Sequence, residues 1–426
     1  MLKIFWFRKD LRLIDNRALS FFINSIEKQD NFSFIYIKNK NSYKYYGEKR
    51  ISFLYESLIE LKKDLKKYGL NSNVLDGNSL DIFKKLVETY GTIEIFCNEQ
   101  VEPHCLKRDF EVNKYIESNS GKFHFFRDTT LMDLNKIIKD DSTPYTVFTP
   151  FKNKLLKLLS PKDYEECKVK LNKLNPKNEV NINFIPALNF EWNYNKSGKS
   201  TYIKGGRINA INQLNTFINK KIRNYNIDRD FPAINGTSLI SAHLHFGTIS
   251  IRECFRLIDT NKNKSIGVEK WRDELIWREL YYNISYNFPY IANGSFKKKY
   301  DNLNWNYDRK LFKLWCEGKT GFPIVDAGMR QLNKEGWMHN RVRMIVAMFL
   351  TKDLLIDWKL GERYFAENLI DFDFASNNGG WQWSASTGCD AQPYFRIFNP
   401  YLQSKRFDPE GLYIKKYVKE LKNVIY

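Results

Sequence analysis

The first 130 residues alternate short apolar runs with stretches of helical spacing. Five apolar runs have the length of buried strands: 2–7, 32–37, 73–75, 93–97 and 123–126. The clearest helical stretch spans 47–68 and aligns five side chains on one face: Ile51, Leu54, Leu58, Leu61 and Leu65. This alternation predicts a Rossmann-like parallel sheet with helices on both faces. The sequence has no GxGxxG motif, so nothing places a nicotinamide cofactor there.

The pattern changes after residue 130. Residues 131–200 are polar, rich in asparagine and lysine, and interrupted by prolines, which predicts an interdomain linker around a short helix at 150–159. From residue 201 a period of 3.6 dominates, and helices are predicted at 204–224, 238–258, 267–287, 308–316, 322–335, 338–356 and 361–370. We therefore expect an α/β domain at 1–130, a linker at 131–200 and an all-helical domain at 201–426.

The charge balance adds a partner class to this picture. Lysine and arginine outnumber aspartate and glutamate by 68 to 49, giving a formal net charge of +19. Such a surplus suits a polyanion such as DNA or RNA. The alternative is a generally lysine-rich composition, since lysine, asparagine and isoleucine are frequent along the whole chain. Aromatic residues form 16% of the chain, which also fits a protein that holds planar ligands.

Cysteine usage and the lengths of apolar runs indicate the cellular compartment of the protein. The six cysteines lie far apart, with no CxxC pair and no metal-like spacing to histidine, so we expect buried thiols, a reducing compartment and no metal. The N-terminal residues Met1 to Trp6 read as a first strand, not as a signal peptide. No run approaches the ~18 apolar residues of a membrane span. We expect a cytoplasmic protein without membrane contact.

The most informative segment is Asp371–Trp383, with the sequence DFDFASNNGGWQW. It combines two acids, two amides, two glycines and two indoles within a few helical turns, a mixture that a plain core segment would not carry. The glycines let backbone approach a flat object, the amides can bond ring heteroatoms, and the indoles offer stacking faces. This composition predicts a site for a planar ligand.

Two further segments carry a family resemblance. They are Trp6–Leu13, with the sequence WFRKDLRL, and Trp337–Met344, with the sequence WMHNRVRM. Together with Asp371–Trp383 they resemble the DNA photolyase/cryptochrome family along nearly the whole chain, and most of all the class I cyclobutane pyrimidine dimer photolyases. The resemblance implies an N-terminal antenna domain at 1–130 and a catalytic helical domain at 201–426 that binds FAD and DNA.

The resemblance implies a set of FAD contacts. The pyrophosphate is expected at Tyr225 and at segment 237–241, although that segment alone also reads as an ordinary helix N-cap. Arg278 is expected beside the phosphates, and Arg343 is expected to pair with Asp371 next to the isoalloxazine ring. The implied contacts are Tyr225, Thr237, Ser238, Leu239, Ile240, Ser241, Trp271, Arg278, Arg343, Asp371, Asp373 and Asn377. The nearby His243 and His245 are expected on a helix surface.

A second set of residues points to the damaged bases. Glu274, Trp277 and Arg278 lie at i, i+3 and i+4, so they share one helix face. The plain alternative is a surface helix with a Glu–Arg pair. By resemblance, Glu274 hydrogen-bonds the damaged base and Trp277 stacks on it, while Trp383 forms a second stacking wall.

The remaining DNA contacts are implied on the next helix and beyond. By resemblance, Asn340 and Met344 line the lesion pocket, and Arg341 and Gln403 contact the DNA backbone. Each of these residues also has an alternative without a DNA role. Arg341 can be a solvated surface arginine, Met344 can fill a helix contact, and Gln403 can belong to a generic basic loop. Asn340 and Met344 resemble the enzymes for cyclobutane dimers, whereas (6-4) enzymes and animal cryptochromes typically carry a histidine pair in this region.

The resemblance also implies an electron path. Asn377 is expected to face flavin N5 with its amide. Trp381, Trp358 and Trp305 match the inner, middle and outer members of a tryptophan chain that returns the flavin to its reduced form. Ten tryptophans make such a trio easy to pick, so the resemblance alone selects these three.

The sequence gives conflicting indications about a second, light-harvesting chromophore. Glu102 matches a glutamate that contacts a pterin, which implies 5,10-methenyltetrahydrofolate as a second chromophore. Folate-using relatives usually carry a Cys-Lys pair after the Trp277 helix, and residues 291–297 read IANGSFK instead.

The expected function is light-dependent repair of cyclobutane pyrimidine dimers by a monomer, through electron transfer from excited reduced FAD to a flipped-out dimer. A cryptochrome-type blue-light photoreceptor without repair is the alternative, and a flavoprotein oxidoreductase is a third class. Glu274, Asn340 and Met344 favour repair by resemblance. The third class would need a nicotinamide or small-substrate site, which the sequence does not show.

Overall fold

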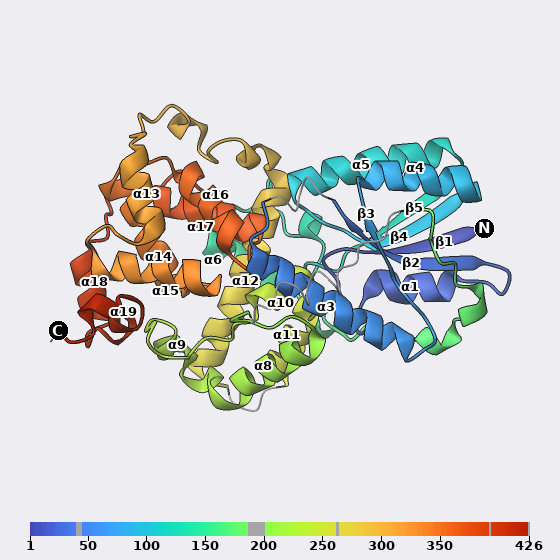
Figure 1. Cartoon of the computed structure of the whole chain (residues 1–426), viewed down its shortest axis with the longest axis horizontal. Coiled ribbons are helices and arrows are strands. Elements are labelled where there is room, and N and C mark those ends of the chain that lie inside the picture. Colours follow the sequence, from blue (N-terminus) through green and yellow to red (C-terminus); the bar gives the residue numbers. More distant parts are fainter. Residues whose placement is uncertain (40–44, 186–200, 261–263, 392, 425–426) are drawn as a thin grey trace.

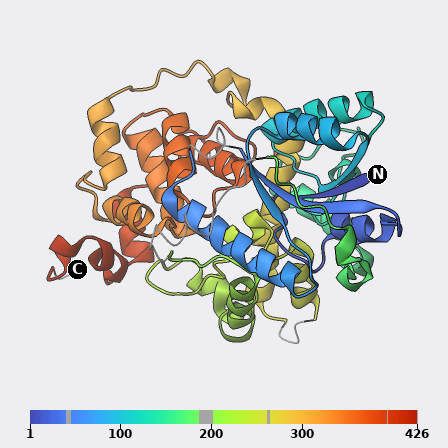
Figure 2. The same cartoon turned by 45° about the vertical axis from the view of Figure 1, so that its right-hand side comes forward.

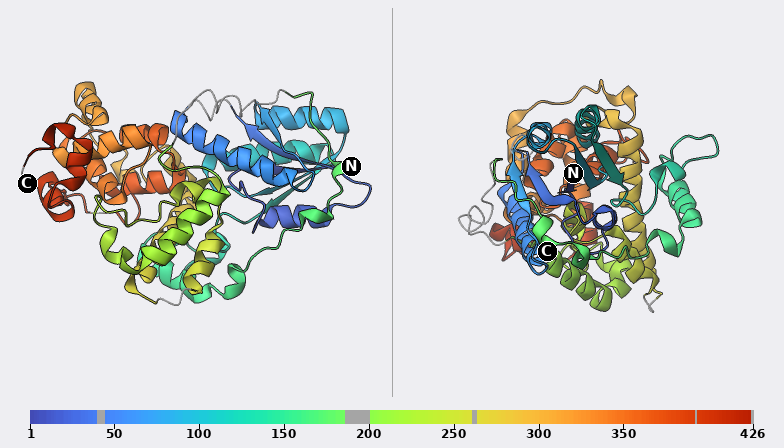
Figure 3. Two further views of the ribbon diagram at one scale, coloured as in Figure 1. Left: turned by 60° about the horizontal axis from the view of Figure 1, so that its bottom comes forward. Right: turned by 90° about the vertical axis from the view of Figure 1, so that its right-hand side faces the viewer.

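The computed structural model describes residues 1–39, 45–185, 201–260, 264–391 and 393–424 (Figure 1). An α/β part built by the N-terminal residues lies beside a mostly helical part. Strand β1 and helix α19 lie at opposite ends of the molecule in two separate views (Figures 1 and 3). Both fold classes predicted from the periodicity are confirmed.

The sheet has five parallel strands in the order β3-β2-β1-β4-β5. They are β1 (Leu2–Phe7), β2 (Asn31–Lys38), β3 (Asn73–Asp76), β4 (Ile93–Asn98) and β5 (Lys122–Phe126). In register, Ile4 of β1 lies opposite Ser33 of β2 and Ile95 of β4. The order reverses between β1 and β4, which is the doubly wound topology.

Helices cover both faces of the sheet. Helices α1 (Arg17–Ser25) and α3 (Glu48–Lys66) pack on one face, and α4 (Ser79–Tyr90) and α5 (Pro103–Ser118) on the other (Figure 1). Successive side chains of a strand point to opposite faces. Phe5 and Phe7 therefore join the core under α1 and α3, and Ile4 and Trp6 join the core under α4 and α5.

The carboxyl ends of β1 and β4 meet the helical part. In doubly wound sheets, the crevice where the strand order reverses is the usual ligand site. Here the segment after β1 reaches the helical part, where Leu11 N–H donates to Phe246 O at 3.1 Å. Helix α3 reaches from the sheet to the helical part (Figure 2). It adds a second contact there, because Lys49 Nζ donates to Asn333 O at 2.9 Å. The helical part thus packs against the carboxyl ends of the strands and against helix α3.

A network of buried charges joins the two parts. Asp15 is fully buried and accepts from Arg252 at 3.0 Å and from Arg256 at 2.9 Å. Asp128 accepts from Arg252 at 2.7 Å and pairs with Arg12. Burial opposes the charge on Asp128, yet the charges of Arg12 and Arg252 hold its pKa well below the ordinary value. Asp15 and Asp128 therefore stay ionised between the two parts.

The described part of the predicted linker packs against the helices. The helix expected at 150–159 is present as α6 (Phe148–Leu158). Short 3₁₀ turns surround it: Leu134–Lys136, Pro161–Asp163, Leu171–Lys173 and Pro176–Asn178. Leu131, Leu134 and Ile137 are buried in one core with Phe151 and Leu155 of α6. Residues 186–200 lie outside the described residues, and the three domain limits stay a prediction.

The C-terminal part contains α8 (Arg207–Lys220), α9 (Tyr225–Asp228), α10 (Ser241–Phe246), α11 (Ile251–Asp259), α12 (Ile266–Asn287), α13 (Arg309–Glu317), α14 (Pro323–Glu335), α15 (Asn340–Met348), α16 (Trp358–Asn368), α17 (Phe374–Ala385), α18 (Pro400–Phe407) and α19 (Leu412–Tyr417). Further 3₁₀ turns span Ile222–Asn224, Pro289–Ala292, Lys298–Tyr300 and Lys419–Leu421. Helices 267–287, 308–316 and 322–335 are confirmed to within one residue, while 204–224 is shorter and 361–370 begins and ends earlier.

Two predicted helices end early for identifiable reasons. The stretch 238–258 breaks at Gly247, which adopts the left-handed conformation at φ 64° and would overlap Lys9 backbone if it carried a Cβ. The stretch 338–356 passes into one π-helical turn, Phe349–Asp353, and stops at Leu355, whose φ is 54°. In both cases long-range packing overrides a continuous apolar period.

All six cysteines are free thiols, and five of them are buried, as the scattered spacing predicted. In the described ranges, no helix is both long enough and apolar enough to cross a membrane.

Candidate active site

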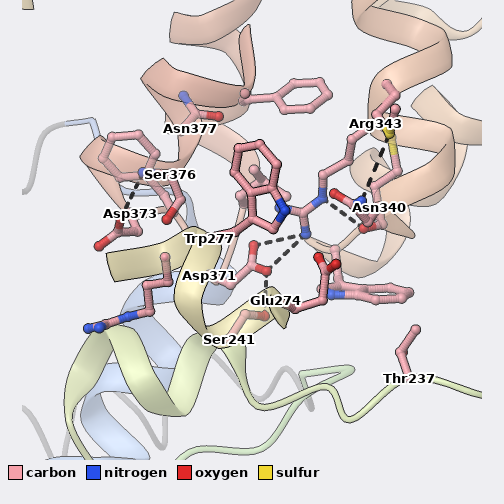
Figure 4. Close-up of a pocket in the computed structure, with 18 of the residues that line it drawn as sticks. Thr237, Ser241, Glu274, Trp277, Asn340, Arg343, Asp371, Asp373, Ser376 and Asn377 are labelled. Atoms are coloured by element: carbon pink, nitrogen blue, oxygen red, sulfur yellow. Dashed lines mark hydrogen bonds and ion pairs between the residues drawn. The ribbon is translucent and has the colours of Figure 1, made fainter. Parts of the chain in front are cut away.

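A cavity of about 350 Å³ opens among the helices of the C-terminal part (Figure 4). This volume falls within the ~300–1,000 Å³ typical of small-molecule sites. An adjoining pocket of about 210 Å³ shares most of its lining and adds Trp271. The predicted residues that line the cavity are Tyr225, Thr237, Ser238, Leu239, Ile240, Ser241, Glu274, Trp277, Arg278, Asn340, Arg343, Met344, Asp371, Asp373, Asn377 and Trp381.

Helix α12 presents three of these side chains on one face. Glu274, Trp277 and Arg278 all border the cavity, as their helical spacing predicted. Glu274 forms an ion pair with Arg229, which follows α9. Arg278 Nη1 donates to Thr129 O at 2.9 Å, and its guanidinium lies 4.2 Å from the centre of the Tyr282 ring. The surface-helix alternative does not apply to this face.

Arg343 and Asp371 form the expected ion pair inside the cavity. Arg343 Nη2 lies 2.9 Å from Asp371 Oδ2, and Ser241 Oγ donates to the same oxygen at 2.6 Å (Figure 4). Arg343 Nε also donates to Met338 O at 2.8 Å. The arginine is therefore held by the backbone just before α15 and by the carboxylate just before α17, and Asp371 is buried whereas Arg343 is partly exposed and Ser241 is exposed.

Asp373 caps helix α17 and stays ionised. Its carboxylate accepts from Ser376 N–H at 2.9 Å and from the Tyr282 hydroxyl at 2.6 Å. Burial opposes this charge, yet the neighbouring His245 and the charge of Lys9 hold the pKa of Asp373 well below its ordinary value. Lys9 belongs to the α/β part, so both parts of the molecule act on this carboxylate.

The expectation that His243 and His245 lie on a helix surface is wrong. Both are buried, at 1% and 4% exposure, because α10 is enclosed by α3, α12 and the segment after β1. Burial lowers the pKa of His243 to about 3 and that of His245 to about 4. The His245 imidazole is therefore neutral at pH 7. It lines the adjoining pocket, and its Nδ1 lies 3.6 Å from Asp373 Oδ2.

The two glycines of α17 have different tasks. A Cβ on Gly379 would overlap the ring of Tyr281, so this glycine allows α17 to pack closely on α12. A Cβ on Gly380 would meet nothing within 4 Å, and Gly380 lines the cavity. Only Gly380 therefore leaves room for a flat ligand. Next to it, Asn377 Nδ2 donates to Glu362 O at 3.1 Å and lines the cavity as well.

Several predicted residues do not line the cavity. Trp383 lies outside it, because residues two apart on a helix point in different directions and Trp383 packs beside a neighbouring core. Arg341 Nη2 pairs with Asp230 at 2.5 Å. Gln403 is half-buried on α18. Of the two side chains expected to hold the damaged bases from opposite walls, Glu274 lines this cavity and Trp383 does not.

The tryptophans of the expected electron path differ in burial. Trp381 lines the cavity and is buried against Phe365, with ring centres 5.0 Å apart. Trp358 is buried, and Trp305 is partly exposed beside the same core. Trp315, which the sequence did not single out, lies 6.0 Å from Trp381 between ring centres.

Glu102 is not open to a surface ligand. It is only 1% exposed, and its carboxylate pairs with Lys9 at the joint between the two parts. The expectation of a pterin contact at this side chain therefore has no support from its position.

Other lining residues were not predicted as site residues. They are Tyr281, Trp337, Met338, Ala347, Phe365, Leu369, Phe372, Ser376, Gly380 and Ser384. Helical spacing could have found five of them, because Tyr281, Ala347, Ser376, Gly380 and Ser384 each lie three or four residues after a predicted site residue on the same helix or at its N-cap. The others are ordinary apolar or small residues whose place depends on packing.

Comparison with known proteins gives a consistent family. Residues 3–169 match the family described as DNA photolyase, and residues 271–425 match the FAD binding domain of DNA photolyase. The curated deoxyribodipyrimidine photo-lyase of Alkalihalophilus pseudofirmus is 37% identical over 434 residues, which cover 99% of this chain and 88% of the relative.

Solved structures share the whole architecture. An archaeal photolyase from Sulfolobus tokodaii, determined with two FAD molecules, superposes with a TM-score of 0.84 and 34% identity, covering 100% of this chain and 92% of the other. A cryptochrome from Synechocystis superposes with a TM-score of 0.84 and 26% identity, covering 100% and 90%. Proteins named photolyase and cryptochrome thus share this fold, so the fold alone does not separate them.

Proposed function

The chain belongs to the DNA photolyase family, and we propose that its helical cavity carries out light-dependent repair of cyclobutane pyrimidine dimers in DNA with bound FAD. The observation that supports this best is the cavity itself. It brings Glu274 and Trp277 of α12 next to the Arg343–Asp371 pair. One cavity thus joins groups suited to a pyrimidine edge and groups suited to a flavin.

The residues present fit FAD. Gly380 leaves open space along one wall for a planar ring, and Asn377 offers an amide beside it. Arg278 and Arg343 supply positive charge for phosphates, and the hydroxyls of segment 237–241 supply donors. When bound, FAD supplies the light-driven electron, and the protein supplies placement and electrostatics.

Damaged DNA reaches the cavity by base flipping. The positive charge of the chain favours phosphate contacts, which are independent of sequence and weaken as salt rises. Arg341 and Gln403 are our proposed backbone contacts, and Arg341 must then exchange Asp230 for a phosphate. The weakened stacking of a dimer lowers the cost of turning it out of the duplex.

Inside the cavity, α12 and α15 hold the dimer. Trp277 provides the stacking face, and Asn340 and Met344 form the neighbouring wall. Glu274 faces the pyrimidine edge, where it hydrogen-bonds the dimer after giving up Arg229. We assign no wall to Trp383, because it lies outside the cavity.

We propose Trp381, Trp358 and Trp305 as the path that returns electrons to the cofactor. The order from a cavity wall, through a buried ring, to a partly exposed ring supports this direction. A second chromophore, 5,10-methenyltetrahydrofolate, stays a proposal from family resemblance alone, and so do a monomeric state and a cytoplasmic location.

The test is repair of a defined substrate. Purified holoenzyme with pre-reduced FAD is mixed with UV-irradiated oligothymidylate and illuminated with blue light. We expect recovery of thymine absorbance in the light and none in the dark. Tight binding without recovery, with the flavin fully reduced, would contradict repair and favour a photoreceptor. Neither binding nor recovery would contradict both.

A further inference from the structure

The indole of Trp277 is covered on one side by a ring from the predicted linker. Phe148 and Trp277 stack with ring centres 4.0 Å apart and an angle of only 3° between planes. Trp277 lines the cavity and Phe148 does not. Phe148 therefore covers the indole from outside the cavity, and the uncovered parts of the indole are those open to a ligand.

Phe148 is itself held in place by two segments. It is the first residue of α6, where helices leave backbone donors unpaired. Its N–H donates to Asp390 Oδ2 at 3.0 Å, and this carboxylate comes from the segment after α17. The N-cap residue Val147 offers no side-chain bond, so Asp390 acts as the cap from a distant part of the chain.

Helix α6 is also fixed directly to the helix that carries Trp277. Lys152 Nζ lies 2.7 Å from Asp273 Oδ1, and Asn283 Nδ2 donates to Tyr145 O at 3.0 Å. Asp273 and Asn283 stand on α12 on either side of Trp277. The stacked pair therefore cannot slide without breaking polar contacts at both ends.

We propose that Phe148 is a positioning residue for lesion recognition, which fixes the plane of Trp277 so that a flipped-out pyrimidine meets a preoriented ring. An indole with free rotation would lose entropy on stacking with a base, and a ring that is already oriented avoids that cost. The segment predicted as a linker thereby takes part in damage recognition. This inference rests on the proposed function, because it takes Trp277 as the stacking face.

The test compares three side chains at one position. Phe148→Leu keeps apolar bulk but removes the flat ring, and Phe148→Tyr keeps the ring. In the dark, holoenzyme Kd values are measured for UV-irradiated and for unirradiated oligothymidylate. We expect Phe148→Leu to lower the preference for irradiated DNA about two- to tenfold, the range of one aromatic pair, while Phe148→Tyr keeps it. Phe110→Leu, on the exposed face of α5, is the matched control.

A second measurement does not depend on DNA. Near-ultraviolet circular dichroism should differ between wild type and Phe148→Leu in the indole bands, and this difference should vanish in a Trp277→Phe background. Equal preference for irradiated DNA in Phe148→Leu and wild type would overturn the inference while leaving repair intact. Equal loss in Phe148→Leu and Phe148→Tyr would overturn it too. If wild-type protein shows no preference, the proposed function fails, and the dichroism still decides whether Phe148 orients Trp277.

Discussion

Glu274 is paired with Arg229 in the protein without DNA, so the two side chains must separate before a base can bind. Replacing Glu274 by Ala should leave FAD content unchanged and lower the repair quantum yield by most of its value, because the dimer loses its acidic hydrogen-bond partner. The measurement is repair of irradiated oligothymidylate per absorbed photon.

The matched control is Glu269→Ala, an exposed acid in the first turn of the same helix. It should repair at the wild-type yield. If the Glu274→Ala yield equalled that of this control, Glu274 would have no part in the reaction.

Single residues show where sequence reasoning succeeds. The pairing of Arg343 with Asp371 and the shared face of Glu274 and Trp277 could be predicted, since family resemblance and helical spacing fix them. The partner of Glu274 could not, because Arg229 follows a four-residue helix and its direction depends on tertiary packing. Trp383 is absent from the cavity lining, and spacing could not show this, because it tells only that the rings of Trp381 and Trp383 diverge.

Helix α17 offers a comparison of neighbouring glycines. Gly379→Ala should lower the free energy of unfolding by about 1–3 kcal/mol, because the methyl group overlaps the Tyr281 ring. Gly380→Ala should be neutral or add up to about 1 kcal/mol through helix propensity, yet it should reduce FAD content. Chemical denaturation of the apoproteins and flavin absorbance of the purified proteins measure the two effects. Identical behaviour of both variants would refute the division of tasks.

Helix α12 carries a buried acid that makes stability depend on pH. Glu279 is fully buried, and burial raises its pKa to about 7 despite the opposing charge of Arg278. The folded protein binds this proton more tightly than the unfolded chain, so stability is lost as pH rises from about 4.5 to 7. Wild type should lose roughly 3 kcal/mol relative to Glu279→Gln over this range, by an order-of-magnitude conversion.

Denaturant unfolding of both proteins across that pH range gives the comparison, with Glu269→Gln as the exposed control on the same helix. Parallel profiles of wild type and Glu279→Gln would mean that Glu279 titrates normally.

Elements were predictable where local pattern and packing agree. Helix α12 and the five strands follow directly from periodicity. The helix break at Gly247 could not be predicted from periodicity, because it depends on the close approach of the Lys9 backbone, which lies in another part of the chain. The residues 131–137 read as polar linker, yet four apolar side chains there, Leu131, Met132, Leu134 and Ile137, join the core around α6, in a stretch too short to give a clear periodic signal.

The joint between the two parts should dominate stability. Asp15→Asn leaves Arg252 and Arg256 short of a buried counter-charge, and the free energy of unfolding should fall by about 3 kcal/mol or more. Asp64→Asn removes the partner of the exposed Lys67 and should change it by no more than about 0.5 kcal/mol. Thermal or denaturant unfolding monitored by both tryptophan and flavin signals measures the effect. Equal stability of the two variants would show that the joint is held by apolar contacts alone.

The segment after β1 explains why the joint escaped prediction. Residues 8–16 are rich in charge, which usually indicates a solvated loop, but here Arg8 pairs with Asp109, Arg12 pairs with Asp128, and Asp15 pairs with Arg252 of the helical part. Such pairing is invisible in one sequence, because the partners lie more than 100 residues away along the chain. The global arrangement therefore had to come from family resemblance.

The same burial has a consequence for synthesis on the ribosome. Domains usually fold in order as they emerge. Here Asp15 pairs with Arg252 and Leu11 N–H donates to Phe246 O, so these two residues of the α/β part lack these partners until about 240 more residues have been translated. The α/β part should therefore be less stable in nascent chains halted before residue 246 than in the full-length protein.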